Sequence, residues 1–270
     1  MKVSKAFGNF VLWVAIAIAI NVLIFVLRGE RAAVEFLGGY IIEMSLSMDN
    51  LFLFLMVFNS FGLSMHAEAR VLDYGIFVAM LLRMVFIFLG VKVVNGFHSI
   101  LYIFGIIIFI SALNIFFKKD EVKDFRQSKI IKILKKIIPF TNNFVGDKFF
   151  VKNRNKLYAT PLLAVLIIIE LSDIMFAIDS IPAIFSITTD PTIVYVSNIC
   201  AVICLRSMYF LLAKLNNMFK YVKYGVAFIL MFTGVKLMGL FFNLCISNIA
   251  SILIILMILL TSILISFIFD

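Results

Sequence analysis

Charged residues are scarce in this chain: Asp, Glu, Lys and Arg make up 14% of its 270 residues, while 64% of the residues are hydrophobic. A soluble domain has about a quarter of its residues charged, because its surface must face water. The shortage therefore excludes a soluble globular protein. It indicates an integral membrane protein whose outer surface faces lipid.

Histidine and cysteine are also rare, with two and three copies. His66 and His98 fall between apolar runs, where we interpret them as surface residues. Cys200 and Cys204 are four residues apart in an apolar run, and Cys245 lies beside another run. For the first two, a soft-metal pair is the alternative to plain helix packing, and packing is favoured. Copper and zinc, which prefer imidazole and thiolate ligands, are not expected.

Motifs of soluble enzymes are absent from the sequence as well. The chain contains no HExxH motif, no phosphate-binding glycine loop and no set of Ser, His and Asp typical of hydrolases. We therefore expect a protein that is not an enzyme and that holds no cofactor.

Long apolar runs dominate what is present. Each is long enough to cross about 30 Å of hydrocarbon as a helix, at about 1.5 Å per residue. The eight runs cover residues 7–27, 34–58, 71–95, 99–117, 158–187, 192–213, 221–242 and 247–269. The first run lacks a small-residue cleavage site, so we expect a retained helix rather than a signal peptide. The sequence predicts an all-α polytopic membrane protein with about eight transmembrane helices.

Basic residues concentrate in one segment, residues 118–157, which holds twelve Lys and Arg against four acids, a balance of +8. The positive-inside rule makes this loop cytoplasmic, and the other basic loops then fall on the same side, apart from Arg28 and Arg31. The loop contains SKIIKILKKII, which predicts a short amphipathic helix on anionic lipid. Nucleic-acid binding is disfavoured, because the basic run ends at membrane helices.

Clusters of acidic residues occur within two of the apolar runs, in the stretches EMSLSMDN and ELSDIMFAIDSIP. A carboxylate at the centre of a bilayer costs about 3 kcal/mol on insertion scales, so such residues usually mark an ion pathway. The oxygen-bearing side chains in question are Glu43, Asp49, Asn50, Glu170, Asp173 and Asp179.

The two stretches are related to each other. An acid stands six residues before the central aspartate in both, at Glu43 and Asp49 and again at Asp173 and Asp179. Each stretch is followed by a helix with one arginine and then by a third apolar helix. The two units start on opposite sides of the membrane, which predicts inverted three-helix repeats of the kind that build secondary transporters.

This repeat divides the chain into five parts. They are an N-terminal helix (1–33), a first repeat (34–117), the basic cytoplasmic loop (118–157), a second repeat (158–242) and a C-terminal helix (243–270).

The spacing of the acids predicts broken helices. Six residues turn through about 600° on an ideal helix, so the paired acids point about 120° apart. They converge only if the segment unwinds or lines a cavity. Pro182 lacks an N–H and clashes with the carbonyl of Ile178, which frees that oxygen beside Asp179. Carboxylate, amide and carbonyl oxygens together suit Mg²⁺, Ca²⁺ or Mn²⁺.

The balance of charges also favours a site for a divalent cation. Five acids face two arginines, Arg83 and Arg206, and the deficit falls from three to two if Lys236 reaches the site. A divalent cation fits this deficit. Protonation of some acids would also close it, and a purely structural lock of paired residues is the other alternative. The arginines are expected to support the carboxylates, since guanidinium cannot coordinate a cation.

Five stretches in order carry a family resemblance: AVEFLGGYIIEMSLSMDNLFLF, RVLDYGIFVAMLLRMVFIFLG, TPLLAVLIIIELSDIMFAIDSIPAIFSITTDP, YVSNICAVICLRSMYFLLA and YVKYGVAFILMFTGVKLMG. Over about residues 33–242 the chain closely resembles the TerC family of integral membrane proteins. The resemblance implies a protein of the bacterial inner membrane that exports manganese, in a family named for tellurite resistance. Family members often carry two helices before the GYIIE segment, whereas this chain has room for one, and its central loop is unusually rich in lysine.

The resemblance implies that the residues at the family's acidic motif positions bind the metal. These are Glu43, Ser47, Asp49, Asn50, Glu170, Asp173, Asp179 and Ser180. Arg83, Arg206 and Pro182 are expected to support them. Asp49 and Asp179 are expected as central ligands, and Glu43 and Asp173 as ligands or proton carriers.

The expected function is export of Mn²⁺ by alternating access, driven by exchange against protons. The expected partners are a divalent metal ion, carried as substrate, and the lipid bilayer. One alternative is a non-transporting membrane factor that assists insertion or metalation of other proteins. Another is a transporter whose cargo is Ca²⁺ or Mg²⁺.

Overall fold

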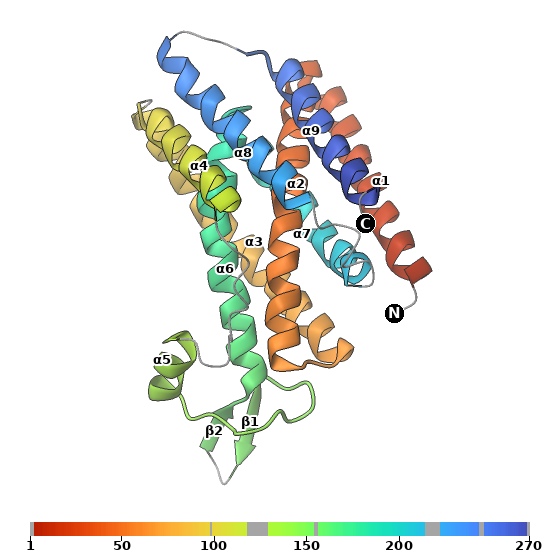
Figure 1. Cartoon of the computed structure of the whole chain (residues 1–270), viewed down its shortest axis with the longest axis vertical. Coiled ribbons are helices and arrows are strands. Elements are labelled where there is room, and N and C mark those ends of the chain that lie inside the picture. The colour runs from red at the N-terminus through yellow and green to blue at the C-terminus, as the bar shows by residue number, and fades with distance from the viewer. Residues whose placement is uncertain are drawn as a thin grey trace.

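Long helices lie side by side as a bundle, with a short helix and a β-hairpin at one end (Figure 1). The computed structural model describes residues 3–97, 99–117, 129–153, 156–213, 222–242 and 246–268. The long helices are α1 (Val3–Arg28), α2 (Glu30–Phe61), α3 (Met65–Gly96), α4 (Ile100–Phe117), α6 (Pro161–Phe185), α7 (Pro191–Leu212), α8 (Val222–Gly239) and α9 (Asn248–Ile268). The 3₁₀ turn Leu240–Phe242 follows α8.

Each predicted apolar run overlaps one of these helices over most of its length, which confirms the all-α polytopic membrane fold. Within the described residues, seven helices are long and apolar enough to cross a bilayer. The exception is α4, whose described apolar part, Ile100–Ile115, is shorter, so its crossing stays a prediction.

Local sequence signals set several helix ends. Thr160 and Asp190 precede α6 and α7, and each side chain accepts backbone N–H bonds at the start of its helix. A proline follows each of these residues, at a position where its missing N–H is no loss. At the end of α2, Gly62 adopts a left-handed conformation with φ 61°, which glycine accepts without a steric penalty.

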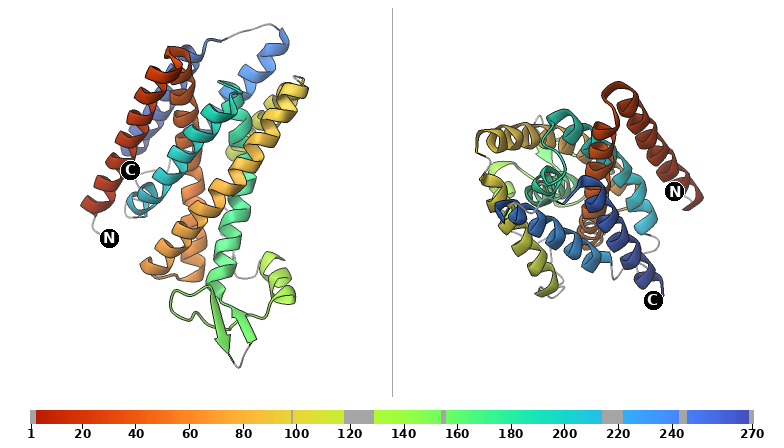
Figure 2. Two further views of the ribbon diagram at one scale, coloured as in Figure 1. Left: turned by 180° about the vertical axis from the view of Figure 1, so that it is seen from behind. Right: turned by 90° about the horizontal axis from the view of Figure 1, so that it is seen from above.

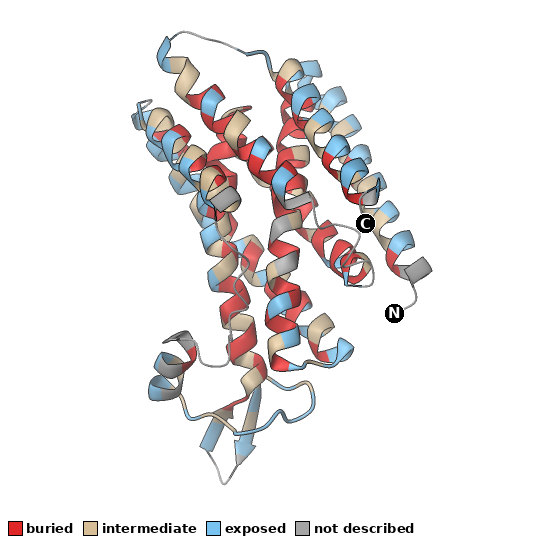
Figure 3. Cartoon of the chain, in the orientation of Figure 1, coloured by how far each residue is buried: buried red, intermediate tan, exposed pale blue. Residues whose placement is uncertain are grey.

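Burial divides the bundle into an inner layer and a lipid-facing surface. The outer faces of α1 and α9 are mostly exposed, while α2 and α7 are mostly buried (Figure 3). Apart from Arg28 at the end of the helix, the exposed side chains described on α1 are apolar, such as Val22 and Val26. In water this surface would be unstable, so it is the surface expected to contact lipid.

The helix contacts have an internal symmetry, and Figure 2 shows the packed helices from behind and from above. Helix α2 packs against α7 and α3 packs against α6, while α4 packs against α8. Further contacts join α2 to α6, α3 to α7, α4 to α6 and α2 to α8. These contacts are unchanged when α2, α3 and α4 are exchanged with α6, α7 and α8, as the inverted repeat predicts. The repeat itself stays a prediction.

The basic segment between the two halves folds in part. The amphipathic stretch forms helix α5 (Lys129–Ile137), and strands β1 (Phe150–Asn153) and β2 (Lys156–Ala159) pair antiparallel. Residues 118–128 of the predicted loop lie outside the described residues. Helix α6 begins at Pro161, later than the predicted residue 158, because the preceding residues pair in β2.

A close glycine contact brings α4 against α8. A methyl group built on Gly234 would lie 2.9 Å from the carbonyl oxygen of Gly105 and 3.0 Å from the backbone nitrogen of Phe109. Backbone atoms cannot move aside as a flexible side chain can. Small residues at such crossings let membrane helices pack closely.

We expect Gly234→Ala to destabilise the protein by about 1–3 kcal/mol, because the added methyl group overpacks this crossing. The thermal unfolding midpoint in detergent measures the effect. The matched control is Gly8→Ala on α1, where an added methyl group meets no atom within 4 Å. Equal midpoints for both variants would contradict the close contact.

Candidate functional site

Both acidic helices are continuous, so the predicted unwinding is wrong. Helix α2 runs from Glu30 to Phe61 and α6 from Pro161 to Phe185 without interruption. Pro182 lies three residues before the end of α6, where few hydrogen bonds remain to be lost. The acids of the two stretches meet in a different way, through a side chain from a third helix.

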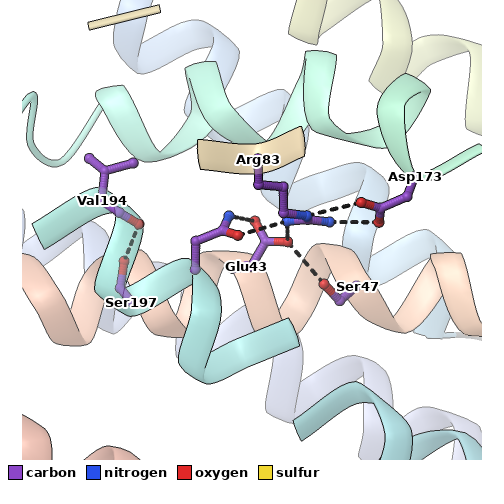
Figure 4. A network of polar contacts seen from close by, with 7 residues as sticks. Glu43, Ser47, Arg83, Asp173, Val194 and Ser197 are labelled. Atoms are coloured by element: carbon purple, nitrogen blue, oxygen red, sulfur yellow. Dashed lines mark hydrogen bonds and ion pairs between the residues drawn. The ribbon is translucent and has the colours of Figure 1, made fainter. Parts of the chain in front are cut away.

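That side chain is Arg83 of α3, which lies between Glu43 of α2 and Asp173 of α6 (Figure 4). Its Nε and Nη2 donate to the two carboxylate oxygens of Asp173 at 3.0 and 2.7 Å, a bidentate pair. Its Nη1 donates to Oε1 of Glu43. One guanidinium therefore holds a carboxylate from each predicted repeat.

Glu43 has further partners that fix its orientation. Ser47, one turn along α2, donates to Oε1 of Glu43 at 3.1 Å. From α7, the amide nitrogen of Asn198 donates to Oε2 of Glu43 at 3.0 Å, and its oxygen accepts from Arg83 at 3.2 Å. The network thus joins α2, α3, α6 and α7.

All five members of this network, which we call the Arg83 network, are buried. Glu43, Ser47 and Asn198 are fully inaccessible, Arg83 is 1% exposed and Asp173 is 5% exposed. Two carboxylates against one guanidinium leave a formal charge of −1. In a medium of low polarity, bidentate charge-assisted bonds are what make this burial tolerable.

Glu170 lies one turn before Asp173 on α6 and is also buried, at 8% exposure. Its Oε2 has no hydrogen-bond partner among the described residues. A cavity of about 30 Å³ lies beside it, with Glu170, Asp173 and Arg206 as its ionisable lining. That volume is large enough to hold a water molecule. A buried carboxylate here is thus open to a small polar or charged occupant.

Asp179, two turns beyond Asp173, lies apart from the Arg83 network. It is half-buried and accepts a hydrogen bond of 2.9 Å from the hydroxyl of Ser111 on α4. Its predicted counterpart, Asp49, lies on α2, but its side chain is outside the described part of the structure. Asn50 and Ser180 are both buried, and the Ser180 hydroxyl has no partner among the described residues.

The remaining cations point elsewhere. Arg206, the arginine of the second predicted repeat, pairs with Asp73 at 2.8 Å, and both side chains are about half exposed. Lys236 is buried and its ammonium lies 3.5 Å from the oxygen of Asn248, at the start of α9. In this arrangement neither cation forms an ion pair with Glu43, Asp173 or Asp179 within the described residues.

Five of the predicted ligands are therefore distributed over three places: Glu43, Ser47 and Asp173 in the Arg83 network, Glu170 beside the cavity, and Asp179 at the contact between α6 and α4. Within the described ranges, no three His, Cys, Asp or Glu side chains lie close enough together to hold a metal ion. The proposed ligand set stays a prediction. Its oxygen donors suit a hard divalent cation, but Glu43 and Asp173 already hold a guanidinium.

Two contributors were missed from the sequence. Asn198 is the one amide in the apolar run 192–213, a signal of the same kind as the acids, since polar groups within a span need a partner. Ser111 gave no such signal, because a lone serine is common in membrane helices and can bond its own backbone.

Comparison with known proteins identifies similar chains. Residues 27–270 match the family described as "Integral membrane protein TerC family". The chain is 39% identical over 246 residues to "Putative membrane-bound redox modulator Alx" of Escherichia coli K12, covering 88% of this chain and 77% of that protein. It is 38% identical over 263 residues to "Thylakoid membrane protein TERC, chloroplastic" of Arabidopsis thaliana, covering 97% and 68%. No solved structure matches the chain.

We expect Arg83→Met to destabilise the protein by about 3–5 kcal/mol, because it leaves two buried carboxylates without their counter-ion. Folded yield on size exclusion and the thermal midpoint in detergent measure the loss. Combining Arg83→Met with Glu43→Gln and Asp173→Asn should restore much of the stability, since no uncompensated charge remains.

Arg28→Met serves as the control for this series. Arg28 pairs with Asp190 at 3.1 Å, but the two side chains are 47% and 31% exposed, so we expect a change of roughly 0–1 kcal/mol. Stable Arg83→Met protein with no gain from the triple substitution would contradict the pairing.

Proposed function

Because the chain belongs to the TerC family of integral membrane proteins, we propose that it is a transporter that exports a divalent metal cation, Mn²⁺ above others, by alternating access. In this proposal the protein is a multi-pass protein of a bacterial inner membrane, and its basic segment faces the cytoplasm. The metal ion is the substrate, and no resident cofactor takes part.

One observation carries the proposal: within the described residues, buried acids outnumber the cations that pair with them. Glu43 and Asp173 share Arg83, while Glu170 and Asp179 have no salt bridge to a described residue. A structural lock needs balanced charge, because each unpaired buried ion lowers stability. A cation that crosses the membrane needs buried acids whose charge is not already neutralised, and such acids mark ion pathways.

The Arg83 network then represents a closed arrangement. Its guanidinium occupies oxygens that a cation needs, so an ion can bind Glu43 or Asp173 only when Arg83 releases that carboxylate. Arg83 keeps the second carboxylate as its partner during such an exchange. This competition between a guanidinium and a metal ion couples binding of substrate to movement of α3 against α2 and α6.

Arg206 has the matching position in the second predicted repeat. It lines the same cavity as Glu170 and Asp173, although it forms an ion pair with the half-exposed Asp73. In the opposite access state, Arg206 turns inward and neutralises Asp173 while Arg83 moves outward. The two arginines thereby alternate as counter-ions of the central acids, as inverted repeats predict.

Two rival functions remain to be tested against this one. A non-transporting membrane factor would use the Arg83 network as a structural lock, so purified protein in liposomes would move no metal. A transporter for Ca²⁺ or Mg²⁺ would use the same oxygen ligands, with selectivity set by the size of the cavity. Flux of Mn²⁺ in the presence of competing Ca²⁺ and Mg²⁺ distinguishes all three.

We predict that Asp179→Asn and Asp49→Asn each abolish saturable Mn²⁺ flux into liposomes that contain the purified protein. Loss of the carboxylate charge removes a ligand but keeps the side-chain shape. Flux is followed with a metal-sensitive dye inside the liposomes, at several proton gradients, so that coupling to protons is measured in the same experiment.

The matched control is Asp147→Asn, the same chemical change in the segment between α5 and β1, where flux should be unchanged. Folded yield is compared for all three variants. Wild-type rates in both of the helix variants would refute the site. Absence of flux from the unmodified protein would favour the non-transporting rival.

A further inference from the structure

Helix α5 lies beside the end of the bundle where α6 begins (Figure 1). Its Ile131 is 7% exposed and shares a hydrophobic cluster with Leu162 and Val165 from the first two turns of α6. The candidate span on α6 starts at Pro161. The axis of α5 is therefore held at the level where the chain enters the membrane.

The neighbouring hairpin is fixed at the same level. The ring of Phe149, just before β1, packs edge-on against Tyr74 of α3 with centroids 5.1 Å apart. The hydroxyl of Thr160 donates to the backbone oxygen of Lys148 at 2.6 Å. The segment is thus attached to α3 and α6.

Helix α5 uses only part of its apolar surface for this packing. Ile131 is buried and Leu134 packs against the same cluster, but Ile133 is 57% exposed and Ile137 is 70% exposed. Positions 133 and 137 are one turn apart, so they form a continuous apolar edge. Lys136, next to this edge, is exposed.

We propose that α5 is a membrane-surface helix, and that its Ile133 and Ile137 edge inserts among anionic lipid headgroups. The position of α5 favours lipid as the partner of this edge. Because α5 lies beside the start of the α6 span, Ile133 and Ile137 face the level of the lipid headgroups. Charge selects the lipid: four of the nine residues of α5 are lysines, and the whole basic segment has a balance of +8. Basic amphipathic helices with this division of residues lie in the membrane interface.

The single tryptophan of the chain, Trp13 on α1, makes a direct test simple. In a Trp13→Phe background, Ile137→Trp provides a fluorescent probe on the apolar edge. The full-length protein is reconstituted in phosphatidylcholine alone and in an equal mixture of phosphatidylcholine and phosphatidylglycerol. Quenching by acrylamide reports exposure to water, and quenching by brominated lipid reports insertion.

In the anionic bilayer, the tryptophan of Ile137→Trp should be shielded from acrylamide and quenched by brominated lipid, and high salt should weaken both effects. Replacing all four α5 lysines with Gln should weaken the preference strongly, since each lysine near an anionic surface is worth a roughly fivefold change in partitioning. Ile133→Trp repeats the measurement on the same edge in case Ile137→Trp folds poorly.

Asn143→Trp, in the exposed segment before β1, is the control and should stay open to acrylamide in both bilayers. Equal exposure of the edge in the two bilayers overturns the proposal and leaves a protein partner as the occupant. Equal shielding in both bilayers also overturns it, because insertion would then not depend on lipid charge.

Discussion

A single buried guanidinium holds the centre of this membrane protein together. Arg83 forms a bidentate pair with Asp173 and a second ion pair with Glu43, at a depth where all three are almost inaccessible. Neither carboxylate would be tolerated there alone, because water does not solvate it and lipid cannot. The packing of α2, α3, α6 and α7 around one another therefore depends on this charge being present and correctly oriented.

Much of the architecture follows from the sequence by simple physics. The length of a bilayer fixes the length of an apolar helix, so each of the eight runs identified one helix. The alternation of isoleucine and lysine in residues 129–137 likewise predicted α5. These features are local, and a local pattern is sufficient to specify them.

The centre was less predictable, because its contacts join residues far apart in the chain. The 120° separation of acids six residues apart suggested that each helix must either unwind or line a cavity. In fact Glu43 of one helix meets Asp173 of another, so no unwinding is needed. The hydrogen bonds of Asn198 depend on the packing of α2 against α7, which the spacing of residues in the sequence does not predict. Arg83 and Arg206 look equivalent in sequence, yet one is buried and the other half exposed.

In the proposed function this inequality has a direct role, because Arg83 closes a site that a divalent cation would open by taking over a carboxylate. The most direct measurement is anomalous scattering at the manganese edge from crystals of the protein grown with Mn²⁺. If the protein exports Mn²⁺ in this way, a manganese peak lies within the bundle, bound by carboxylate oxygens of the two acidic helices, with Arg83 withdrawn from Glu43 or Asp173. A saturated crystal with manganese only on the surface, and with the Arg83 network intact, would contradict it.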